Sequence, residues 1–113
     1  MAKGQEVAGG IVHVTAGTFD GVVTSERTVL IDFWAPWCGP CRAVAPVLEE
    51  IARELGDRVT IGKVNVDDEP ALAGRFGVRS IPTLMFFKDG TLQVTVVGAV
   101  PKNEILKRLQ ALE

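Results

Sequence analysis

The chain has 113 residues, of which 47% are hydrophobic and 23% are charged, and its formal net charge is -2 at pH 7. This length predicts one domain, and the apolar content excludes a disordered chain, a collagen-like repeat and a coiled coil. Twelve basic against fourteen acidic residues leave no basic excess of the kind that nucleic-acid binders carry. No apolar stretch approaches the ~18 residues of a membrane span. We therefore expect no nucleic-acid partner and no membrane partner.

Residues 1–10 (MAKGQEVAGG) are mostly small or polar, and they predict a flexible leader before a domain at residues 11–113. They lack the apolar centre of a secretory signal, so we expect a cytoplasmic protein. A monomer is the expected state for a domain of this size. Residues 11–14 are a candidate strand, and Thr15 is a candidate cap for a brief helix that carries Phe19, Val22 and Val23.

The middle of the chain predicts a buried strand followed by an amphipathic helix. Residues 28–34 (TVLIDFW) are almost continuously apolar, which is typical of a central strand covered on both faces. Pro46 lies inside the predicted helix at residues 38–55 and lacks a backbone donor, so we expect a kink there and a structural role for this residue. Apolar side chains recur along this helix at the spacing of one face, namely Val44, Val47, Leu48, Ile51 and Leu55.

The second half predicts a strand at 59–66, a short helix begun near residues 67–70 and ended by Gly77, and a hairpin of strands 83–87 and 92–97. Pro101 then opens a last helix. The resulting order is βαβαβ, a short helix, then ββα. Strands joined by helical crossovers are parallel, and the hairpin is antiparallel. The predicted fold is α/β, with a mixed five-stranded sheet and helices on both faces.

Cys38 and Cys41 are the two cysteines, and they stand where the central strand meets the long helix. Unpaired N–H groups and the helix dipole favour a thiolate at that position, so we expect the pKa of Cys38 to lie below the ~8.5 of an ordinary thiol. Cys41 lies one turn further, within reach of a disulfide. The predicted reaction is attack of Cys38 on a disulfide of another protein, followed by attack of Cys41 on the mixed disulfide. Cys41 should be the more buried thiol.

Three other interpretations of this pair stay open. A purely structural disulfide that closes four residues would contribute roughly 2 kcal/mol in the chain-entropy model. A zinc site needs about four ligands, and only His13 remains after the two cysteines, so we expect no metal. A binding module that uses the apolar surface around Cys38 without turnover is the alternative from another class. The position at a strand-to-helix junction favours redox chemistry.

Asp32 interrupts the apolar run of the central strand. Burial of an isolated carboxylate is costly and should raise its pKa, so that it can exchange a proton near neutral pH. Lys63 is the expected countercharge if the two strands adjoin. We predict that Asp32 accepts the proton of Cys41; the alternative is a structural aspartate satisfied by the lysine.

Residues 33–41 (FWAPWCGPC), with Asp32 before them and Pro46 after them, resemble the thioredoxin family. The likeness extends through Lys63, the segment 80–83 (SIPT) and the segment 97–99 (VGA), and it covers essentially residues 11–112. It implies the thioredoxin fold, Cys38 as nucleophile and Cys41 as resolving thiol, and proton transfer assisted by Asp32 with Lys63. It also implies a cis Ile81–Pro82 bond facing the disulfide, whereas sequence physics alone would read that proline as a strand boundary.

The resemblance further implies disulfide-containing proteins as substrates and thioredoxin reductase, drawing on NADPH, as the electron donor. It implies no bound cofactor beyond the reversible disulfide. Trp34 is expected to support the loop without touching substrate. A shallow contact surface for substrate is implied for Trp37, Gly39, Pro40, Ile81, Pro82, Gly98 and Ala99.

The alternative within the family is a disulfide-forming oxidant or an isomerase. Such proteins typically carry a histidine between the cysteines, where a cation stabilises the thiolate and makes the disulfide more oxidising. Gly39 and Pro40 offer no charge. The sequence therefore favours a general protein-disulfide reductase.

Overall fold

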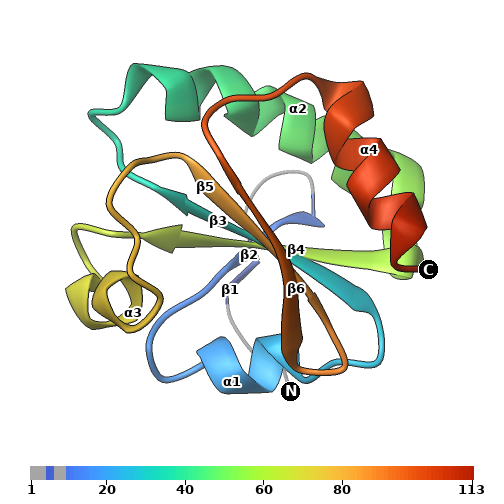
Figure 1. Ribbon diagram of the computed structural model, residues 1–113, viewed down its shortest axis with the longest axis horizontal. Helices are drawn as coiled ribbons and strands as arrows, with labels where there is room; N and C mark the ends of the chain where they lie inside the picture. Colours follow the sequence, from blue (N-terminus) through green and yellow to red (C-terminus); the bar gives the residue numbers. More distant parts are fainter. Residues whose placement is uncertain (1–4, 7–9) are drawn as a thin grey trace.

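The computed structural model describes residues 5–6 and 10–113 and shows a sheet between two layers of helices (Figure 1). Its elements in chain order are β1 (Gln5–Glu6), β2 (Val12–His13), α1 (Phe19–Val23), β3 (Thr28–Trp34), α2 (Gly39–Leu55), the 3₁₀ segment η2 (Gly56–Arg58), β4 (Val59–Asn65), α3 (Pro70–Arg75), β5 (Thr83–Lys88), β6 (Thr91–Val97) and α4 (Lys102–Ala111).

The sheet of the described residues has the order β1-β2-β4-β3-β5-β6. β4 runs parallel to both β2 and β3, while β5 runs antiparallel to β3 and β6. The predicted mixed α/β fold is therefore confirmed, with parallel strands joined by helical crossovers and a closing hairpin. β3 lies in the centre, and the loop after its carboxyl end leads into α2.

Alternate residues of β3 enter two different cores. Leu30 packs in a cluster with α2 and α4, whereas Ile31 and Phe33 pack in a cluster with α1 and α3 on the other face. Figure 1 shows the two helix pairs on opposite sides of the sheet. Because side chains of a strand alternate between faces, Asp32 points to the face that α2 covers. This is the face that carries the cysteines.

Helix α2 begins directly after Cys38, which is its N-cap, and continues through Pro46 to Leu55. Its apolar stripe packs Val44, Leu48 and Ile51 into the core beneath it. On its exposed side, Lys102 at the start of α4 forms ion pairs with Glu50 and Glu54. These contacts fix the direction of the helix whose first turn holds both cysteines. The kink expected at Pro46 stays a prediction.

Three local details differ from the sequence predictions. β1 adds a sixth strand, because Gln5–Glu6 pair antiparallel with β2 inside the segment predicted as a leader. β2 spans two residues rather than four. The N-cap of α1 is Thr18 and not Thr15, whose carbonyl oxygen instead accepts the N–H of Phe19 at 2.9 Å. Residues 1–4 and 7–9 lie outside the described residues, so the flexible leader and a domain boundary at residue 11 stay predictions.

Gly62 in β4 lies against side chains from the chain segments on both sides of it in the sheet, and this close contact leads to a stability prediction. A Cβ atom at this position would lie 2.7 Å from Val14 Cγ2 and 3.1 Å from Ile31 Cδ1. We expect Gly62→Ala to lower the free energy of unfolding by about 1–3 kcal/mol, the usual range for overpacking a core. Gly74→Ala is the matched control, because nothing lies within 4 Å of a Cβ there. It should be neutral or stabilising in urea denaturation, and equal losses in both variants would contradict the steric explanation.

Candidate active site

The two cysteines form a disulfide across the first turn of α2. Cys38 has extended backbone angles as the N-cap, and its Sγ accepts the backbone N–H of Cys41 at 3.2 Å. The Cα atoms of the pair are 5.3 Å apart. The sulfur of Cys38 thus occupies the position where a helix N-cap places its acceptor atom. A thiolate formed there receives the same hydrogen bond and the favourable field of the helix N-terminus.

Both sulfurs lie in a small apolar cluster at the carboxyl end of β3. Cys38 is 4% exposed and Cys41 2%, and Ala35 completes the buried cluster. Trp34 and Ile81 pack against it from either side. The exposures follow the predicted order, although the difference between the two cysteines is small. Both cysteines are therefore largely covered, Cys41 slightly more than Cys38.

The loop before β5 brings a backbone carbonyl against the disulfide. The Ile81–Pro82 bond is cis, as the resemblance implied, and the Ile81 carbonyl oxygen lies 3.8 Å from Cys38 Sγ. The Pro82 carbonyl oxygen accepts the N–H of Gly98 at 2.8 Å. This hydrogen bond places the segment at Gly98 and Ala99 beside the loop. In Figure 1 the loops that enter α2 and β5 lie on the same side of the molecule.

The residues implied for substrate contact come from the disulfide loop, the cis-proline loop and the segment after β6, and most of them are exposed. Trp37 is 67% exposed, and its indole Nε1–H donates a hydrogen bond of 2.9 Å to Asp67 Oδ2. Gly39, Pro40 and Ala99 are exposed, whereas Pro82 is buried. Val97, which is 59% exposed, extends the apolar surface beside Gly98. Sequence reasoning missed Val97 and Asp67.

Asp32 is completely buried, and neither of its carboxylate oxygens has a hydrogen-bond partner within the described residues. Removal of this carboxyl from water raises its pKa from 3.8 to about 7, and the positive charge of Lys63 opposes the rise by a smaller amount. The group therefore changes protonation near neutral pH. It does so on the face of the sheet that α2 covers.

Lys63 lies opposite Asp32 in the β3–β4 register, so the two strands adjoin as predicted. Its ammonium group, however, lies 4.2 Å above the ring of Trp34 in a cation–π contact. Among the described residues no hydrogen bond joins the two side chains, because both oxygens of Asp32 are unpartnered. Lys63 therefore does not satisfy Asp32 by a hydrogen bond, and the choice between a proton acceptor and a structural aspartate stays a prediction. Lys63 acts on Asp32 through its field alone.

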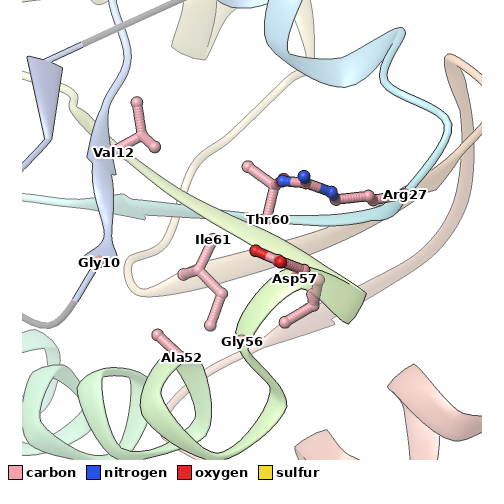
Figure 2. A pocket seen from close by; sticks show the side chains of 9 residues that line it. Gly10, Val12, Arg27, Ala52, Gly56, Asp57, Thr60 and Ile61 are labelled. Carbon is pink, nitrogen blue, oxygen red and sulfur yellow. The ribbon is translucent and has the colours of Figure 1, made fainter. Parts of the chain in front are cut away.

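Two of the cavities that described residues line include neither cysteine. The larger, of about 310 Å³, opens where β4 begins and is lined by Gly10, Arg27, Asp57 and Thr60 among others (Figure 2). It lies at the opposite ends of the parallel strands from the disulfide. The smaller, of about 170 Å³, lies between the segment 76–80 and the end of β6, close to the cis-proline loop.

Within the described residues no three histidine, cysteine or acidic side chains gather to hold a metal ion. None of the helices in the same part of the chain has the length and apolarity needed to cross a bilayer. A disulfide at a helix N-cap with a backbone carbonyl beside it, on the same face of the sheet as a buried titratable carboxyl, is typical of a dithiol–disulfide oxidoreductase. The redox group is the Cys38–Cys41 pair itself.

Comparisons with known proteins agree with this class. The thioredoxin family model matches residues 10–111. Thioredoxin 1 of Synechococcus elongatus is 57% identical over 97 residues, which cover 85% of this chain and 91% of the relative. Thioredoxin 1 of Nostoc sp. is 52% identical, covering 87% and 92%, and the thioredoxin of Haemophilus influenzae is 50% identical, covering 84% and 90%. The chain belongs to the thioredoxin family. It is a thiol–disulfide oxidoreductase, and its family implies disulfide-containing substrates and a reductase partner.

Proposed function

We propose that this enzyme works as a general protein-disulfide reductase, and that NADPH supplies its electrons through thioredoxin reductase. The observation that carries the direction of the reaction is the composition of the active-site turn. Gly39 and Pro40 bring no cation next to Cys38, so the thiolate is held only by the N–H of Cys41 and the helix N-terminus. A less stabilised reduced form is a stronger reductant.

The proposed reaction begins with the reduced dithiol. Cys38 as thiolate attacks one sulfur of a substrate disulfide, the substrate S–S bond breaks, and the leaving sulfur takes a proton from solvent. A mixed disulfide joins Cys38 to the substrate. Cys41 is held inside the cluster at 2% exposure, so it is placed to react with Cys38 and not with outside disulfides. The N-cap position of Cys38 and the lower exposure of Cys41 support the proposed roles of Cys38 as nucleophile and Cys41 as resolving thiol.

Asp32 is proposed to take the proton of Cys41 in the second step. The new thiolate attacks Cys38 Sγ, the Cys38–Cys41 bond forms, and the second substrate sulfur leaves with its electron pair. Two electrons have then moved from the dithiol to the substrate. A carboxyl with a pKa of about 7 suits this transfer, because it is partly ionised at neutral pH and is a strong enough base to accept a proton. Lys63 keeps part of the carboxyl population ionised.

The substrate is proposed to lie in an extended form across the surface defined above by Trp37, Gly39, Pro40, Ile81, Pro82, Gly98 and Ala99. Trp37 contributes the largest exposed apolar area beside the disulfide. Backbone groups of the cis-proline loop are available to pair with a peptide. Trp34, which packs against the cysteine cluster, and Pro46 in α2 are proposed to have structural roles. A shallow apolar surface with few charges favours many substrates over one.

A domain at residues 11–113, a monomeric state and a cytoplasmic location complete the proposal. Glutathione-rich cytosol keeps thiols reduced, and a reductase fed by NADPH belongs in such a compartment.

The redox equilibrium of Cys38–Cys41 tests the proposed direction. The protein is equilibrated with glutathione buffers of graded potential, and free thiols are counted after alkylation by intact mass. We expect the pair to stay oxidised until the buffer is more reducing than the cytosolic glutathione pool, about -220 to -260 mV by extraction. Reduction in mildly reducing buffer would instead identify an oxidant or isomerase.

A variant with both Cys38→Ser and Cys41→Ser separates turnover from binding. It keeps the apolar surface and lacks both sulfurs, so it should reduce no insulin disulfides with dithiothreitol as donor. Full function of this variant in cells that depend on the protein would favour the binding module and reject the reductase.

A further inference from the structure

Trp37 is a large, exposed side chain, and it would rotate freely if no specific contact held it. It stands one residue before Cys38 and is 67% exposed. The described residues give its indole one hydrogen bond, from Nε1–H to Asp67 Oδ2 at 2.9 Å, across thirty positions of sequence. We propose that Asp67 is a positioning residue that holds the Trp37 indole in the orientation in which protein substrates dock. This inference rests on the proposed function.

The acceptor is itself held in place by the end of β4. Asp67 donates its backbone N–H to Asn65 Oδ1 at 2.9 Å. The carbonyl oxygen of Asn65 accepts the N–H groups of Asp68 and Glu69, which closes the turn. Asn65 is the last residue of β4 and pairs with Trp34 at the end of β3. The carboxylate of Asp67 is therefore anchored to the same strand ends that carry the disulfide loop.

A second contact ties this turn to the rest of the fold independently of Trp37. Glu69 Oε1 accepts the backbone N–H of Ala16 at 2.8 Å, in the loop before α1. The turn therefore keeps its position when the Asp67 carboxylate is removed. Asp67 and Asp68 are both exposed, and only Asp67 contacts the indole. The carboxylate of Asp67 can therefore position the Trp37 indole, and the turn is expected to keep its conformation when this carboxylate is removed.

Orientation of Trp37 affects a large substrate more than a small one. A side chain that is already fixed loses less rotational freedom when a partner covers it, and each such side chain changes affinity by about two- to tenfold. A small disulfide reaches Cys38 without covering the indole. Asp67 is therefore a determinant of protein docking, and the attack of Cys38 proceeds without it.

The test compares Asp67→Ala with Asp68→Ala, which removes the same charge from the next residue. Each variant is assayed with insulin and with the small disulfide 5,5′-dithiobis(2-nitrobenzoate). We expect Asp67→Ala to raise KM for insulin by about two- to tenfold with kcat retained, while its rate with the small disulfide stays within about twofold of the parent. Asp67→Asn retains a carbonyl acceptor and should recover most of the loss. Asp68→Ala should match the parent.

Two further measurements separate positioning from other effects. In a Trp34→Phe background, the fluorescence anisotropy of Trp37 should fall in Asp67→Ala and not in Asp68→Ala. In a Trp37→Phe background, Asp67→Ala should cause no additional rise in KM, because the donor is already absent. Equal losses in the two aspartate variants, an equal loss with the small disulfide, or unchanged anisotropy would each overturn the proposal. If the parent protein fails to reduce insulin, the proposed function is wrong. The anisotropy of Trp37 would still test whether Asp67 holds the indole, independently of that function.

Discussion

Replacement of Cys41 by serine is expected to turn the protein into a trap for its substrates. Cys38 attacks a substrate disulfide as before, but a serine hydroxyl cannot break the mixed disulfide that results. Steady-state reduction of insulin should fall by about a thousandfold or more, because the reaction stops after one covalent step. Intact mass spectrometry after incubation with a disulfide peptide should show one peptide attached to each protein. Dithiothreitol should release it.

Cys38→Ser is the matched control for this trap. Its remaining sulfur, Cys41, is 2% exposed behind the first turn of α2, so it should form almost no adduct with the same peptide. Each variant carries one oxygen in place of one sulfur, and the two replaced positions lie at the two ends of the first turn of α2. Adducts on Cys38→Ser but not on Cys41→Ser would reverse the assigned roles. Normal turnover by either variant would reject the two-thiol mechanism.

Asp32→Ala is expected to stabilise the fold at alkaline pH by about 2–4 kcal/mol. The folded protein holds the Asp32 proton up to a pKa of about 7, whereas the pKa of an unperturbed aspartate carboxyl is 3.8. The native state therefore binds more protons than the unfolded state between these values, and stability falls as pH rises from about 4 through 7. The rise of the pKa from 3.8 to about 7 corresponds to about 4 kcal/mol of lost stability, and the cavity that alanine leaves reduces the gain from its removal.

The pH dependence distinguishes this effect from ordinary repacking. Urea denaturation of the parent and of Asp32→Ala should give free energies of unfolding that differ most above pH 7 and converge toward pH 4. Asp68→Ala, at an exposed position, should show no such trend. A difference of the same size at pH 4 and pH 8, or a destabilised variant at pH 8, would contradict a buried carboxyl that ionises near neutrality.

The same substitution should slow catalysis in the resolving step. Without Asp32 no buried base accepts the Cys41 proton, so mixed disulfide should accumulate transiently in Asp32→Ala, and general-base contributions of this kind amount to about a hundredfold or more. Quenched-flow trapping with iodoacetamide, followed by mass analysis, measures the intermediate directly. The lifetime of the intermediate should shorten at higher pH as solvent hydroxide replaces the base. An unchanged rate of the resolving step in Asp32→Ala would mean that Asp32 has a purely structural role in β3.

The central strand shows why much of this fold could be predicted from sequence. Its residues alternate between two cores, so a strand buried on both faces gives a continuous apolar run in which one aspartate stands out. The position of Cys38 before an amphipathic helix could also be predicted from sequence, because the N-cap, the apolar face of the helix and the preceding loop each have a local sequence pattern. β1 was missed because two polar residues carry no pattern, and their pairing with β2 is a tertiary event.

Contacts between long or distant side chains could not be predicted in the same way. Register places Lys63 opposite Asp32, but a lysine has several rotamers, and the ammonium group lies over Trp34 instead. Asp67 was interpreted only as part of a helix start. One signal was available for it, because the carboxyl ends of neighbouring parallel strands meet, and this brings the turn after β4 near the loop after β3. The cis form of the Ile81–Pro82 bond came from the family resemblance and not from residue physics.

The hydrogen bond from the Cys41 N–H to Cys38 Sγ bears on how a mixed population of oxidised and reduced molecules behaves. The same sulfur can cap α2 in the thiolate and in the disulfide, so the helix start needs no rebuilding between the two redox states. Under the proposed function, we expect oxidised and reduced molecules to compete for the same partners. The ratio of the two forms would then set the flow of electrons, as it does for a mobile carrier in a transport chain.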